Sequence, residues 1–157
     1  MKLTLITAAA VMGVRLVLFN MGRPPEGTDF MLVHFLALVT IIFFTGQSML
    51  RADKRTPFPD LLRDGFRNGA VYALLFGLFI FTYYKVIEPN YFAHRIDLLV
   101  AAGQAAGNPE EIIRPRMEKF FTPFNYASMT FFALLLVGAF NAMLLGLLHH
   151  KVLRRYL

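Results

Sequence analysis

Four long apolar runs dominate this sequence and restrict its fold more than any other feature. They cover residues 3–20, 30–50, 69–86 and 127–149, to within a residue or two. A helix needs roughly 20 apolar residues to cross the hydrocarbon core of a bilayer, with a range of ~17–25. The hydrophobic share of 57% exceeds the roughly 45–50% of soluble domains. The sequence therefore predicts an all-α fold, a four-span transmembrane helical bundle that forms a single membrane domain over residues 1–157.

The first run also has features of a signal peptide. Lys2 precedes the apolar stretch, and the small residues Ala8–Ala10 resemble a cleavage site. Cleavage there would leave only a short apolar remnant, so we expect the run to be retained as the first span.

Basic residues gather on one side of the predicted membrane. With four spans, the N-terminus, the loop 51–68 and the C-terminus share a side that carries nine basic residues against three acidic ones. They are Lys2, Arg51, Lys54, Arg55, Arg63, Arg67, Lys151, Arg154 and Arg155 against Asp53, Asp60 and Asp64. The positive-inside rule therefore predicts cytoplasmic termini, with residues 21–29 and 87–126 outside.

Two segments between the spans are expected to form interfacial amphipathic helices. Residues 58–67 have apolar and charged faces, and we expect them to lie at the inner headgroups. Their arginines would contact lipid phosphates or, alternatively, a docked protein. The outer segment 90–123 is predicted to hold two helices separated at Gly107, with Asn108 capping the second and Pro115 bending or interrupting it. In the first loop, Pro24-Pro25 predicts a tight turn.

Small residues recur one turn apart on the third and fourth spans. Such ridges let helix backbones approach closely in lipid. The sequence therefore predicts that these two spans pack against each other or against a partner's helix. The residues are Gly69, Ala73 and Gly77 on the third span and Gly138, Ala142 and Gly146 on the fourth.

Ionisable and aromatic residues at the outer level of the spans form the candidate site. Arg15 and His34 lie within apolar spans, where charged or titratable groups are functional hypotheses by default. Arg15 either reaches the outer headgroups, pairs with an acid such as Glu88 or Asp29, or binds a phosphate. The candidate anion, headgroup or partner site comprises Arg15, His34, Tyr83, Tyr84, Lys85 and Glu88.

The sequence carries no recognisable catalytic or cofactor motif. It has no cysteine, and His149 and His150 are adjacent, unlike the i, i+4 histidine pair of a zinc helix. We therefore expect no catalytic residue, metal site or cofactor, and no enzymatic activity. Nucleic acid is not an expected partner, because the positive charges cluster at the ends of the apolar runs.

Several short motifs resemble a known family. They are DGFRNG before the third span, the YY that ends it, IEPNY after it and RMEKFFTPF before the fourth span. Together they resemble the membrane protein family known as domain of unknown function 4199. The resemblance implies a bacterial, four-span inner-membrane protein with a long segment between spans three and four. The family name carries no activity, so the resemblance assigns no catalytic residue.

Two functions fit these features. The first is a non-catalytic accessory, scaffold or regulatory subunit of a membrane complex, whose partners are the bilayer, other membrane subunits or further copies of itself. The alternative is an oligomer that binds or transports a lipid or anionic solute, with an anionic lipid held near Arg15.

The charge pattern yields a direct test of topology. We expect a cytoplasmic C-terminus, because the basic loops resist translocation. A reporter fused after Leu157 that is active only outside the cytoplasmic membrane should stay inactive, and the same reporter inserted near Gly107 should be active. The reverse pattern would contradict the predicted orientation.

Overall fold

The computed structural model describes residues 1–23 and 29–156. Residues 24–28, which include the predicted Pro24-Pro25 turn, and the last residue lie outside the described part. The chain divides into two compact units. The first unit is Met1–Phe76 with Phe131–Leu157, and the second is Gly77–Thr130.

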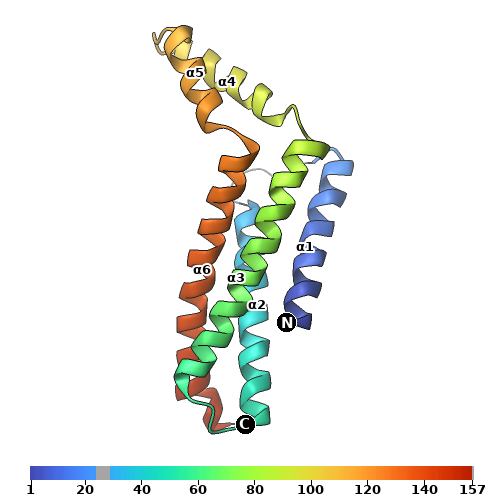
Figure 1. The fold of residues 1–157 in the computed structure, drawn as a ribbon, viewed down its shortest axis with the longest axis vertical. Helices are drawn as coiled ribbons and strands as arrows, with labels where there is room; N and C mark the ends of the chain where they lie inside the picture. Colours follow the sequence, from blue (N-terminus) through green and yellow to red (C-terminus); the bar gives the residue numbers. More distant parts are fainter. Residues whose placement is uncertain (24–28, 157) are drawn as a thin grey trace. The chain divides into compact units, whose positions relative to one another are not determined.

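The described residues form helices and no strand, as Figure 1 shows. Four helices are long and apolar enough to cross a membrane, and they cover Lys2–Asn20, Phe30–Ala52, Phe58–Ile87 and Pro123–Arg155. The predicted all-α, four-span fold is therefore confirmed. The elements are α1 (Lys2–Asn20), α2 (Asp29–Ala52), α3 (Phe58–Thr82), a π-helix η1 (Tyr83–Ile87), α4 (Tyr91–Ala105), α5 (Glu110–Phe120), α6 (Pro123–Lys151) and a 3-10 helix η2 (Leu153–Arg155).

Helix α3 begins earlier than the sequence suggested. Residues 58–67, expected to form an amphipathic helix before the third span, are the first turns of α3, which runs without a break from Phe58 to Thr82. No proline follows Asp60 within it, so every later residue can donate its backbone N–H to the helix. Leu61 is buried, with 3% of its surface exposed. The first turns of α3 therefore pack within the first unit as part of the long helix.

A short turn around Asp53 reverses the chain between α2 and α3. The backbone N–H of Arg55 donates to the Asp53 carboxylate at 2.8 Å, and the Thr56 hydroxyl donates to the Asp53 carbonyl oxygen at 2.7 Å. Pro57 then precedes the first helical residue. The side chain and the backbone carbonyl of Asp53 thus close the connection that makes α2 and α3 antiparallel neighbours.

Small residues bring α3 and α6 into close contact inside the first unit. A Cβ atom added to Gly69 would lie 3.3 Å from the Cα of Gly138, and one added to Gly138 would lie 3.3 Å from the Cα of Gly69. One turn away, a Cβ on Gly65 would lie 3.0 Å from the Cβ of Ala142. A Cβ on Gly146 would lie 3.3 Å from the Phe58 ring. The two helices run antiparallel (Figure 1), with Gly69 against Gly138 and Gly65 against Ala142.

This register includes Gly65, which the predicted ridge omitted. Ala73, predicted as part of the ridge, is fully buried. Gly77 begins the second unit, so its role in packing remains a prediction.

Helix α1 joins the first unit through packing along α2 and through polar contacts, of which one reaches α3. The hydroxyl of Thr4 donates to the side-chain oxygen of Asn68 on α3 at 2.6 Å, and both residues are buried. The Asn68 amide in turn donates to the backbone and side-chain oxygens of Asp64 at 2.9 and 3.0 Å. A chain of hydrogen bonds therefore ties the start of α1 to α3.

In the second unit, α4 ends in a glycine turn. Gly107 has φ +86°, a left-handed conformation that favours glycine. The N–H of Gly107 donates to Gln104, and the N–H of Asn108 donates to Gly103, which is the hydrogen-bond pattern of a Schellman motif. Asn108 therefore closes α4, whereas we had expected it to cap α5. Its side-chain amide also donates to the Gly103 carbonyl at 3.4 Å.

Helices α4 and α5 pack against each other as a hairpin. The Arg114 guanidinium donates to Asp97 of α4 at 2.9 Å and to Glu110 of α5 at 2.7 Å. These hydrogen bonds raise the pKa of Arg114 above its usual range, with the Glu110 bond contributing most. Ile113 packs over Gly103, where an added Cβ would clash at 2.4 Å. Helix α5 continues through Pro115, so the expected interruption is wrong, and the alternative of a bend stays a prediction.

The glycine contact predicts a sharp difference between glycine sites. Gly69→Leu and Gly138→Leu should each lower the thermal stability of the purified protein in detergent. Overpacking of a close contact costs about 1–3 kcal/mol or more. Gly13→Leu is the matched control, because nothing lies within 4 Å of a Cβ at that site. Equal melting temperatures for all three variants would refute the packing contact.

Candidate functional site

Arg15 and His34 meet at one aromatic ring in the first unit. Arg15 is 5% exposed, and its guanidinium carbon lies 5.4 Å from the centre of the Phe30 ring. The His34 ring lies edge-on to the same ring at a centroid distance of 5.0 Å. A cation over an aromatic face gains ~0.5–2 kcal/mol, depending on how far it is removed from water. Phe30 therefore connects α1 with α2 at this level of the membrane.

His34 is held by a hydrogen bond that the sequence analysis did not anticipate. Its Nδ1 lies 2.8 Å from the hydroxyl of Tyr72 on α3. Both side chains are buried, and Phe76 packs edge-on to the imidazole at 4.1 Å. A buried tyrosine usually places its hydroxyl against a partner, so a tyrosine within an apolar span predicts a polar contact but does not identify the partner.

A groove lies beside His34 on the surface of the first unit. It has a volume of about 340 Å³. Its walls come from α2 and α6, and they are apolar except at the histidine. The lining includes Met31, Leu32, His34, Phe35, Ala133 and Val137.

The remaining predicted site residues belong to the second unit. Tyr83 and Tyr84 are buried in η1, where the Glu88 N–H donates to the Tyr83 carbonyl oxygen at 3.0 Å. This i to i+5 hydrogen bond defines a π-helical turn, a feature often found at functional sites. Lys85 lies 5.4 Å from the centre of the Phe81 ring. Glu88 ends the π-helix.

Tyr84 lies at the centre of an aromatic cluster in that unit. Its ring is 4.8 Å from Tyr91, 4.9 Å from Phe92 and 5.2 Å from Tyr126, between ring centres. These partners come from α4 and α6, so the cluster ties three helices of the second unit together. The high share of aromatic residues in the sequence could have predicted an aromatic cluster of this kind.

The structure thus brings the predicted site residues together in two groups. Arg15 and His34 form one, and Tyr83 and Tyr84 form the other with Lys85 and Glu88 nearby. The prediction that the nearest anion to Arg15 is Glu88 or a lipid headgroup stays a prediction. The side chain of Asp29, the other acid considered, lies outside the described part.

A second buried histidine lies at the other end of the first unit. His149 is 1% exposed, and its Nδ1 donates to the Leu145 carbonyl at 2.6 Å. Its ring fills the space left by the missing side chain of Gly46, whose added Cβ would lie 3.1 Å from Cε1. The imidazole therefore acts as a packing element between α2 and α6.

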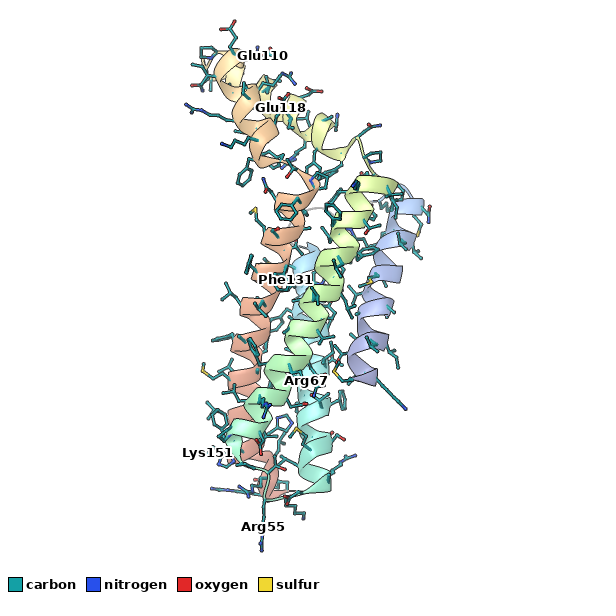
Figure 2. All side chains as sticks on the ribbon, viewed as in Figure 1. Arg55, Arg67, Glu110, Glu118, Phe131 and Lys151 are labelled. Carbon is teal, nitrogen blue, oxygen red and sulfur yellow. The ribbon has the colours of Figure 1, made fainter. Side chains whose placement is uncertain are left out.

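Basic residues mark the same end of this unit. Arg55 lies in the α2–α3 turn and Lys151 at the end of α6, both toward this end of the unit, and Arg67 lies further along α3 (Figure 2). No three histidine or acidic side chains gather as a metal-binding group among the described residues.

One family model matches nearly the whole chain, over residues 2–151, and its description is "Protein of unknown function (DUF4199)". No curated protein and no solved structure matches the chain. Together with the four candidate spans, the match identifies a multi-pass membrane protein. The chain belongs to the family of unknown function 4199.

Proposed function

We propose that this protein is a non-catalytic accessory or scaffold subunit of a complex in the bacterial inner membrane. The observation that carries the proposal is the α4–α5 hairpin, a folded element outside the candidate spans. Two ionic hydrogen bonds of Arg114 and the packing of Ile113 on Gly103 fix its shape. A small membrane protein that carries an ordered helical hairpin is suited to bind another protein.

The surface of the hairpin has the composition expected of a contact region. Leu98 on α4 is 52% exposed and Ile112 on α5 is 50% exposed. The hairpin also carries acidic and basic residues, among them Glu110 and Glu118 on α5 (Figure 2). Protein–protein interfaces combine apolar residues with a polar rim, and the hairpin offers residues of both kinds.

Close packing inside the first unit supports the same role. The contacts between Gly69 and Gly138, and between His34 and Tyr72, join helices α2, α3 and α6. Such contacts hold the helices of this unit close together, which suits a scaffold.

The experiment is gentle detergent extraction followed by mass spectrometry of the proteins that copurify. The wild-type chain should recover a partner in near-stoichiometric amount, and Leu98→Glu or Ile112→Glu should reduce that recovery at least about tenfold, the effect of losing ~1.4 kcal/mol. Ala93→Glu is the matched control, since Ala93 is an exposed residue of α4.

Two results would contradict the proposal. One is a wild-type protein that brings no stoichiometric partner from its native membrane. The other is full recovery of the partner by both hairpin variants while their thermal stability equals that of the control.

A further inference from the structure

Three properties of the groove beside His34 indicate which class of ligand it can bind. Its walls are apolar, it opens between two membrane-spanning helices, and it contains one polar ring. Its volume of about 340 Å³ is within the range of small-molecule sites, roughly 300–1,000 Å³. The residues that carry the argument all belong to the first unit.

The hydrogen bond to Tyr72 determines which nitrogen of His34 is free to bind. The Tyr72 hydroxyl is buried and lies 2.8 Å from Nδ1. If Nδ1 donated this bond, the hydroxyl hydrogen would have no acceptor among the described residues. Donation from Tyr72 to Nδ1 satisfies both groups, and it leaves the imidazole hydrogen on Nε2. No described residue accepts a hydrogen bond from Nε2.

The depth of His34 indicates which acceptor is available there. The second span, Phe30–Ala52, has 23 residues. At 1.5 Å per residue it is about 35 Å long, so each end extends about 2 Å beyond a hydrocarbon core of ~30 Å. His34 lies four residues from Phe30, or about 6 Å along the axis. It is therefore close to the hydrocarbon boundary, where the ester carbonyls of phospholipids lie.

We propose that the groove between α2 and α6 binds one acyl chain of an ester-linked phospholipid, whose ester carbonyl accepts a hydrogen bond from Nε2 of His34. Met31, Phe35, Ala133 and Val137 contact the chain. The phospholipid comes from the leaflet at the α1–α2 end of the first unit. This site goes beyond the accessory role and does not depend on any protein partner.

The probe is a phosphatidylcholine with a photoreactive diazirine near the carboxyl end of one acyl chain. The purified full-length chain is placed in vesicles that contain this lipid, irradiated, and mapped by mass spectrometry. Labelling at Met31, Phe35 and Val137 should exceed labelling at Leu5 and Val17 of α1 about threefold. That ratio corresponds to a hydrogen bond of ~0.6 kcal/mol, the average measured between helices in membranes.

Two comparisons separate the proposed site from ordinary lipid contact. The matching ether-linked lipid lacks the carbonyl. With this lipid, the ratio of labelling in the groove to labelling on α1 should fall toward one. Ala133→Phe should fill the groove and abolish the enrichment, whereas Ala9→Phe, at an exposed position on α1, should preserve it.

Equal labelling of the groove and of α1 would overturn the proposal, as would enrichment that survives Ala133→Phe. Equal enrichment of ester and ether lipids would overturn the role of His34. Because the vesicles contain no other protein, each result is independent of the accessory role.

Discussion

The contact between Gly69 and Gly138 is the constraint on which the first unit depends. In lipid, helices gain little from burying apolar surface, because the lipid chains are as apolar as the side chains. Their association relies instead on van der Waals packing and on hydrogen bonds between helices. Both become available only when the backbones approach closely, and added Cβ atoms at this crossing would come within 3.3 Å of the facing backbone.

The polar contacts follow from this register. Asn68 and Tyr72 are one turn apart on α3, beside the stripe that faces α6, and so reach toward other helices. Asn68 accepts a hydrogen bond from Thr4 of α1, and Tyr72 bonds to His34 of α2. Asn68 and Tyr72 thus join α3 to two different helices. Among the described residues that line the groove beside α6, His34, held by Tyr72, is the polar one.

Local patterns in the sequence predicted the helical fold, because the length of an apolar run alone determines whether a helix can cross a bilayer. Contacts between residues far apart in the sequence were harder to predict. Gly65 was missed because the ridge was counted forward from Gly69, where the apolar run begins. Tyr72 was missed because a tyrosine within an apolar span gives no indication of its partner. The π-helical turn at Tyr83 depends on a hydrogen bond between backbone groups, which no side-chain pattern specifies.

Because the chain has no cysteine, a pair of introduced cysteines tests the central contact directly. A Cβ added at Gly65 would lie 3.0 Å from that of Ala142, near the ~3.5–4.5 Å typical of a disulfide. The double variant Gly65→Cys with Ala142→Cys should cross-link rapidly under mild oxidation in native membranes. Gly65→Cys with Leu144→Cys should not, because Leu144 is 46% exposed on another face of α6. Equal cross-linking of the two pairs, or none in either, would contradict the packing of α3 on α6.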